Sequence, residues 1–138
     1  MYRKGEYHMS TGFGFGTQVE LSFDAAIEKV TTELEKEGFG VMSDIDVAAK
    51  MKAKLDKDMP AYRILGACNP GLAYQAISAV ADIGLLLPCN VLVREDVSGS
   101  VHVDFMDPQS VLSLVGDAGI APLAGEVKAK LQRVMAAL

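Results

Sequence analysis

Apolar residues recur along the chain with two spacings, every second position and every three to four positions. The first spacing predicts strands and the second predicts amphipathic helices between them. The first helix is expected to begin after Ser22, whose hydroxyl can cap it, and to end at Gly38. Its apolar residues recur at intervals of four, three and four positions and so share one face: Phe23, Ile27, Val30 and Leu34. Alternating apolar residues before and after this helix predict strands over residues 12–21 and 39–45.

The stretch from residue 62 to residue 106 predicts a strand, a helix and then a β-hairpin. Residues 62–68 are apolar and bounded by prolines, which is typical of a buried strand. Asn69 is expected to cap the following helix, and Pro70 suits its first position because proline has no N–H to leave unpaired. Gly84 is expected to end that helix.

The turn of the hairpin sets its register. A three-residue loop, Val97-Ser98-Gly99, puts glycine at the position that needs a positive φ. This register sets Val91 opposite Phe105 and Val93 opposite Val103, so one face is apolar. The other face is mixed and suits solvent, a partner subunit or a ligand. It carries Asn90, Leu92, Arg94, His102, Asp104 and Met106.

Capping signals predict further helices. Asp46 is expected to cap a short helix, and Asp107 is expected to cap the helix that Pro108 opens. Pro122 opens a last helix near the C-terminus. The order of elements is therefore β-α-β-(α)-β-α-β-β-α-α, an α+β arrangement. Residues 10–138 are expected to form a single domain, because no repeat or long linker interrupts them. Residues 1–9 do not continue the pattern, and we interpret them as an expression tag or a disordered lead-in.

Composition narrows the classes of partner. The chain has 138 residues, half of them hydrophobic, which is sufficient for one core. Its net charge is −5 and it has no extended basic stripe, so we expect no nucleic-acid partner. No apolar run reaches the roughly 20 residues that a transmembrane helix needs, so we expect no membrane association. Without a signal-peptide pattern, the sequence predicts a cytoplasmic protein with two reduced cysteines.

Several short motifs carry a resemblance to a known family. They are Gly38-Phe39-Gly40-Val41 before Asp44-Ile45-Asp46-Val47, then Gly66-Ala67-Cys68-Asn69-Pro70, the run from Gly84 to Val91, and Asp107-Pro108. Over about residues 16–138 the chain resembles domain-of-unknown-function family 302 (DUF302). The resemblance implies a TBP-like α+β fold with an antiparallel sheet of about five strands, helices on one face, and a homodimer. The family has no established activity, so no catalytic residue is transferred, and fold kinship with TBP-like domains implies nothing about DNA binding.

Cys68 is the best candidate for a catalytic residue, although no motif assigns it a reaction. It directly precedes a predicted helix N-terminus, where the helix dipole can lower the pKa of a thiol and make it reactive. The alternative is a small buried side chain that ends a core strand. Cys89 is expected at the opposite end of the helix from Cys68, so a disulfide between them is not expected, although the sequence leaves it open. The twenty residues between the two cysteines match neither a redox pair nor a zinc motif, so we expect no metal site.

Arg94, His102 and Asp104 share the mixed face of the predicted hairpin. This trio could bind an anionic ligand or contribute acid–base chemistry. The alternative is a polar surface cluster or part of a dimer interface. No motif for a nucleotide or another cofactor accompanies it, so no cofactor is expected.

Three functional hypotheses remain from the sequence. The first is a homodimeric small-ligand-binding or accessory protein, which is favoured over an enzyme because no catalytic triad is present. The second is a thiol-dependent enzyme, or a soft-metal or sulfur-handling protein, that acts through Cys68. The third is a purely structural dimerisation module. The candidate binding residues are Cys68, Asn69, Cys89, Arg94, His102 and Asp104.

Overall fold

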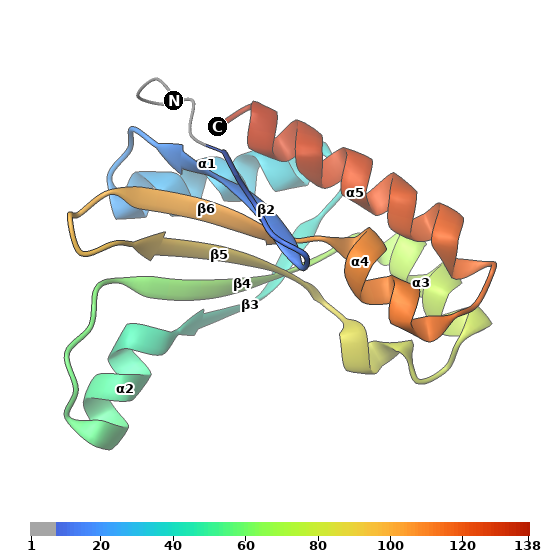
Figure 1. Ribbon diagram of the computed structural model, residues 1–138, viewed down its shortest axis with the longest axis horizontal. Helices are drawn as coiled ribbons and strands as arrows, with labels where there is room; N and C mark the ends of the chain where they lie inside the picture. The colour runs from blue at the N-terminus through green and yellow to red at the C-terminus, as the bar shows by residue number, and fades with distance from the viewer. Residues whose placement is uncertain (1–7) are drawn as a thin grey trace.

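An antiparallel sheet lies at the centre of the molecule, and helices α1 and α5 cover one of its faces (Figure 1). The computed structural model describes residues 8–138, and in that part of the chain the sheet has six strands in the order β1-β2-β6-β5-β4-β3. The predicted α+β fold with an antiparallel sheet is confirmed. Strands β2 to β6 correspond to the five that were predicted, and a three-residue strand, β1, is added at the edge.

The elements follow one another in an order close to the predicted one. The strands are β1 His8–Ser10, β2 Gly14–Val19, β3 Gly40–Asp46, β4 Tyr62–Cys68, β5 Cys89–Glu95 and β6 Val101–Met106. The α-helices are α1 Phe23–Lys36, α2 Val47–Leu55, α3 Pro70–Ala79, α4 Pro108–Leu112 and α5 Ile120–Ala136. Two short 3₁₀ helices, η1 Ile83–Leu86 and η2 Ser113–Val115, complete the chain.

The predicted lead-in falls mainly on residues that the structure does not describe. Residues 1–7 lie outside the described part, and strand β1 begins at His8 and pairs with β2. The division into a lead-in of residues 1–9 and a domain of residues 10–138 therefore stays a prediction.

Side-chain caps fix the starts of four helices where the sequence predicted them. Each capping oxygen accepts a hydrogen bond from a backbone N–H in the first turn, which would otherwise have no partner. The four capping residues are Ser22 before α1, Asp46 before α2, Asn69 before α3 and Asp107 before α4.

The predicted end of α3 at Gly84 is wrong. The helix ends at Ala79, and Val80 is extended, with φ −138° and ψ 102°. The chain then turns so that Ile83, which is 1% exposed, packs with Ala76 and Leu112 in a second hydrophobic cluster. Burial of Ile83 thus determines where the helix ends, because tertiary packing outweighs local helical spacing.

The hairpin register is as predicted. Val91 pairs with Phe105 and Val93 with Val103, and Gly99 has a φ of 85°. These four paired side chains are almost fully buried against α1 and α5. The main hydrophobic core therefore lies between the sheet and these two helices.

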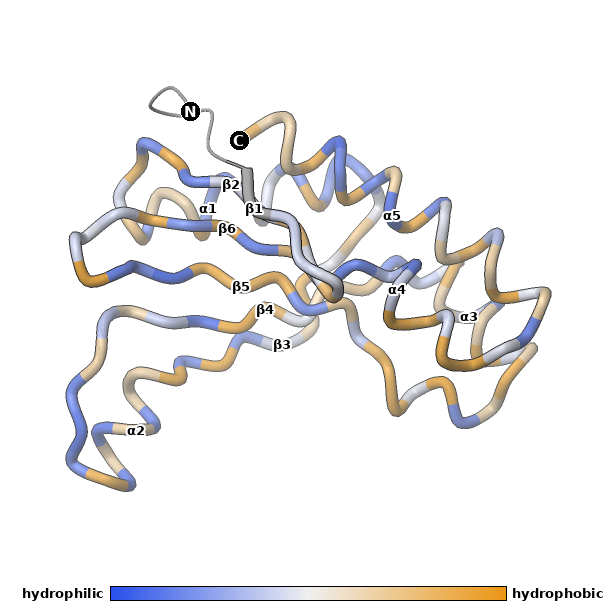
Figure 2. The backbone as a smooth tube through the Cα atoms, in the orientation of Figure 1, coloured by the Kyte–Doolittle hydropathy of each residue, from blue (hydrophilic) through white to orange (hydrophobic). Residues whose placement is uncertain are grey.

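Helix α5 joins the main core to the second cluster. Its C-terminal half packs on the sheet, whereas Ile120 and Ala124 pack with α3, η1 and α4 beyond the end of the sheet (Figure 1). Figure 2 shows that hydrophobic residues are frequent in this second region as well as in the strands. None of the helices in residues 8–138 combines the length and the hydropathy needed to cross a bilayer.

Candidate functional site

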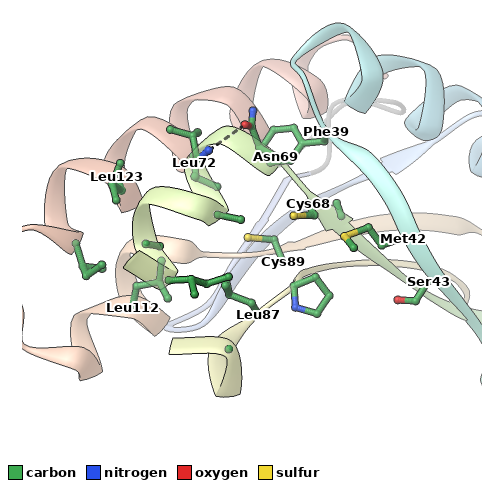
Figure 3. A pocket seen from close by; sticks show the side chains of 18 residues that line it. Phe39, Met42, Ser43, Cys68, Asn69, Leu72, Leu87, Cys89, Leu112 and Leu123 are labelled. Carbon is green, nitrogen blue, oxygen red and sulfur yellow. Dashed lines mark hydrogen bonds between the residues drawn. The ribbon is translucent and has the colours of Figure 1, made fainter. Parts of the chain in front are cut away.

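A cavity of about 360 Å³ lies where the main core meets the second cluster. The ends of β4 and β5 form one side, and α3, η1, α4 and α5 form the others (Figure 3). Its volume falls in the range of small-molecule sites in proteins. The large apolar side chains around it include Phe39, Leu72, Leu87, Leu112 and Leu123.

Small residues on the helix side leave this space unfilled. Ala73 and Ala76 of α3 line the cavity, as does Gly84 in η1. Larger apolar side chains at these positions would occupy the volume, as they do in a close-packed interior. The residues that line the cavity include no charged side chain among those the structure describes, so the space suits an uncharged, apolar occupant.

Asn69 holds together the entrance to α3. Its Oδ1 accepts from the N–H of Leu72 at 3.4 Å, and its Nδ2 donates to the carbonyl of Glu37 at 3.4 Å. Gly38 has a φ of +84°, and a Cβ at that position would lie 3.0 Å from Nδ2 of Asn69. Asn69 therefore ties the end of α1 to the start of α3, and its side chain is engaged in the fold.

The two cysteines are neighbours, so the prediction that they lie at opposite ends of α3 is wrong. Cys89 pairs with Ala67, the residue before Cys68, and both cysteines line the cavity. The ten residues of α3 advance the chain by about 15 Å, and the nine residues from Val80 to Pro88 are long enough to return it. Both cysteines are free thiols.

Burial keeps both thiols protonated. Burial raises the pKa of Cys68, and burial together with the nearby Cys68 raises the pKa of Cys89 to about 11. Cys68 is therefore not a pre-formed thiolate, since burial disfavours the charged form of the thiol. The argument for a nucleophilic Cys68 was a lowered pKa of its thiol at the start of the helix, and the raised pKa removes that argument.

Met42 contributes a third sulfur to the same end of the cavity. The register of β3 against β4 shifts between Val41 and Ser43, which makes Met42 the extra residue of a β-bulge. Bulges redirect side chains, and Met42 lines the cavity although its side chain is 72% exposed. The sequence analysis missed Met42 because a bulge within a short strand leaves no pattern that spacing can detect.

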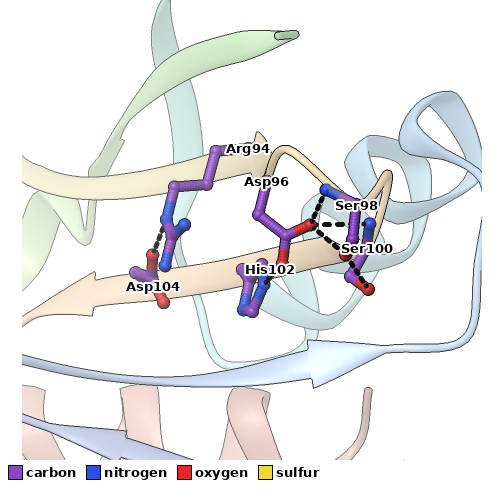
Figure 4. A network of polar contacts seen from close by, with 6 residues as sticks. All are labelled: Arg94, Asp96, Ser98, Ser100, His102 and Asp104. Atoms are coloured by element: carbon purple, nitrogen blue, oxygen red, sulfur yellow. Dashed lines mark hydrogen bonds and ion pairs between the residues drawn. The ribbon is translucent and has the colours of Figure 1, made fainter.

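The remaining candidate residues form a separate polar network at the other end of the hairpin (Figure 4). Nε of Arg94 donates to Oδ2 of Asp104 at 2.8 Å, and Arg94 pairs in register with His102. Nε2 of His102 lies 2.8 Å from Oδ2 of Asp96. Residues His102 and Asp104 are only 8% and 9% exposed, whereas Arg94 and Asp96 are half-buried, so the network is buried only in part.

Asp96 organises the hairpin turn. One of its oxygens accepts hydrogen bonds from the N–H and hydroxyl of Ser98 and from the N–H of Ser100. Hydrogen bonds from Ser98, followed by that from His102, hold the pKa of Asp96 well below its usual value. The sequence analysis missed Asp96, although an aspartate just before a Ser-Gly turn is a local signal for such bonds.

A match to a family model identifies the family. A family model described as "Domain of unknown function DUF302" matches residues 15–138. This chain belongs to the DUF302 family. A crystal structure of an uncharacterized conserved DUF302 protein from Bacillus stearothermophilus is similar, with a TM-score of 0.85 and 23% identity over 91% of this chain and 97% of that chain. At this identity the likeness shows a shared fold, and no curated protein sequence matched.

The candidate binding residues of this DUF302 protein thus fall into two places. Cys68, Asn69 and Cys89 lie at the apolar cavity, joined by Met42. Arg94, His102 and Asp104 lie on the other face of the hairpin, where Arg94 is already paired with a carboxylate. The network is therefore a weak candidate for an anion site, because its cation has a protein partner, and the cavity is the stronger candidate for ligand binding.

Proposed function

We propose that this DUF302 protein binds a small, uncharged, mainly apolar molecule in the cavity between the sheet end and α3. The observation that carries the proposal is an unfilled cavity of about 360 Å³ whose lining is apolar and contains no charged side chain among the described residues. A ligand there would bury its surface against leucine and alanine side chains, which is favourable at roughly 25 cal/mol per Å².

Two features of the lining limit the chemistry of the ligand. A carboxylate or phosphate inside the cavity would lack a cation, and burying an unpaired charge is costly. The few polar groups, among them the thiols of Cys68 and Cys89 and the hydroxyl of Ser43, lie at the sheet end. We therefore expect an apolar body with at most one weakly polar end directed at the strands.

The test is binding of a neutral fluorescent probe, N-phenyl-1-naphthylamine, to the full chain. Ala73→Phe places an aromatic ring in the cavity and should weaken probe binding by about tenfold or more. The control is Ala79→Phe, the same substitution at an exposed position of the same helix that does not line the cavity. The proposal fails if the two variants bind the probe equally well, or if the wild-type protein does not bind it.

The oligomeric state is a separate question. A homodimer and a cytoplasmic location stay predictions, as does the hypothesis of a purely structural dimerisation module. Sedimentation equilibrium, with and without the probe, would show whether the protein is a dimer and whether the cavity depends on it.

A further inference from the structure

Three neighbouring strands bring three sulfur-containing side chains to one end of the cavity. Ala67 pairs with Val41 on one side and with Cys89 on the other. Met42 follows Val41 and Cys68 follows Ala67, so the sulfur residues lie on or next to one row across β3, β4 and β5. All three line the cavity, and Figure 3 shows their side chains gathered at its sheet end.

The position of Met42 has no explanation in core packing. Methionine usually fills gaps in a hydrophobic core, whereas Met42 is 72% exposed and stands on a bulge beside two free thiols. Gly66 supports this arrangement, because a Cβ there would lie 2.8 Å from Cγ of Pro88 and would clash with Oγ of Ser43. The absence of a side chain at Gly66 therefore lets the bulge pack closely against β4.

The three sulfur atoms favour one class of metal ion. Two thiols and a thioether are soft ligands, which favour Cu(I). A structural zinc site usually takes four ligands from cysteine, histidine and carboxylates, and no group of three such residues with metal-binding geometry occurs in residues 8–138. Hard cations need oxygen ligands, and the apolar lining provides few of them.

We propose that Met42, Cys68 and Cys89 bind one Cu(I) ion at the sheet end of the cavity. Binding breaks the S–H bonds of the two cysteines, releases two protons to solvent and forms two copper–thiolate bonds, with the thioether of Met42 as the third ligand. Copper enters and stays as Cu(I), so no electron is transferred. The resulting site carries a net charge of −1 and lies beside the N-terminal end of α3, whose dipole favours an anion.

This site goes beyond the apolar ligand proposed above and does not depend on it. The spacing of the cysteines in the sequence indicated no metal site, because the row that joins them with Met42 exists only across the folded strands.

The test is an anaerobic titration of the reduced full-length protein with Cu(I), in competition with the chelator bicinchoninate. Wild-type protein should bind one Cu(I) per chain, and Cys68→Ser should weaken that binding by about 100-fold. Met42→Leu keeps the apolar lining and should weaken it by about tenfold. The matched control is Met51→Leu, an exposed methionine on α2 that does not line the cavity and should leave the affinity unchanged.

Copper K-edge absorption spectroscopy adds a readout that a folding defect would not mimic. Sulfur-only coordination by three atoms in the wild type, and by two in Met42→Leu, would support the site. The proposal is overturned if Cys68→Ser binds Cu(I) as tightly as the wild type, or if Met42→Leu and Met51→Leu have equal affinities. Ala73→Phe separates the two proposals, since this variant should lose probe binding and still bind Cu(I), because Ala73 lines the cavity but is not one of the three sulfur ligands.

Discussion

Strand β5 begins at the cavity and ends at the polar network. The side chains at its two ends differ in whether they have partners within the protein. At its start, Cys89 faces an apolar space that the protein itself does not fill. Near its end, Arg94 is paired with Asp104, and His102 is bonded to Asp96. The polar side chains at one end are thus bonded to one another within the protein, whereas the apolar side chains at the other end line an unfilled cavity, which is the basis of the proposed ligand site.

One carboxylate oxygen of the polar network has no such bond within residues 8–138. Oδ1 of Asp104 is buried and has no hydrogen-bond partner among the described residues. It lies over Gly16 of β2, the residue that pairs with Asp104 in the sheet. The glycine allows the carboxylate of Asp104 to lie across the neighbouring strand, which explains one glycine of the Gly-Phe-Gly-Phe-Gly stretch.

The largest expected loss of stability is therefore for Gly16→Ala, which lies next to the polar network. A Cβ at this position would lie 2.8 Å from the carbonyl oxygen of Val103 and 2.9 Å from Cα of Asp104, and these backbone atoms cannot move away cheaply. We expect a loss of about 3 kcal/mol in the free energy of unfolding, at the upper end of the usual cost of overpacking. Urea denaturation would measure it.

A matched control for this prediction is Gly12→Ala. No atom lies within 4 Å of a Cβ built there, so the same substitution should change stability by less than about 0.5 kcal/mol. Equal losses at the two positions would show that the loss in Gly16→Ala does not come from its close contacts with Val103 and Asp104.

The second largest expected loss of stability is for Gly66→Ala, which lies next to the cavity. The added Cβ would meet Cγ of Pro88 and Oγ of Ser43, which are side-chain atoms that can shift partly. We expect a smaller loss of about 1–2 kcal/mol, together with weaker probe binding because the bulge at Met42 moves. Urea denaturation and probe titration on the same samples would separate the two consequences.

Gly84→Ala is the control for this second variant. Gly84 also lines the cavity, but no atom lies within 4 Å of a Cβ built at that position. Stability should be nearly unchanged. A loss as large as that of Gly66→Ala would mean that the close contact at Gly66 is not the cause.

The local parts of this architecture could be predicted from the sequence. The caps at Ser22, Asp46, Asn69 and Asp107 depend on residues within three positions, and the hairpin register depends on its own turn. The end of α3 could not be predicted, because it depends on burying Ile83 against residues distant in the sequence.

The candidate site could be predicted only in part. Cys68 and Asn69 were found because a cap marks the start of α3, but their proximity to Cys89 depends on the path of residues 80–88. Met42 depends on a bulge, and the cavity itself depends on where small side chains from α3 and η1 meet the sheet. An empty volume of this kind arises from the assembled elements and leaves no spacing pattern.

The third prediction concerns the loss of stability at low pH. Because the pKa of Asp96 is lowered in the folded state, its contribution to stability is present above the unfolded-state value of about 3.9 and is lost as the pH falls below it. Asp96→Asn should therefore be less stable than the wild type at pH 7, and the difference should shrink as the pH falls from about 4. Urea denaturation at a series of pH values would measure this difference.

The cavity should not share that dependence on Asp96. The lining residues include no carboxylate among those described, so probe affinity should be constant between about pH 4 and pH 7 while the protein stays folded. A fall in probe affinity that follows the stability difference of Asp96→Asn would show that the two ends of β5 are coupled.

The smallest expected effect is a difference in accessibility between the two thiols. Cys89 is 6% exposed, whereas Cys68 is half-buried at the end of β4, so Cys68 should be alkylated first in the native protein. Bound probe should slow alkylation of Cys68, because both occupy the same cavity. Mass spectrometry after timed treatment with iodoacetamide would give both rates. If the probe binds but Cys68 is not protected, the probe occupies a different surface, and the contrast between the two ends of β5 would no longer locate the ligand.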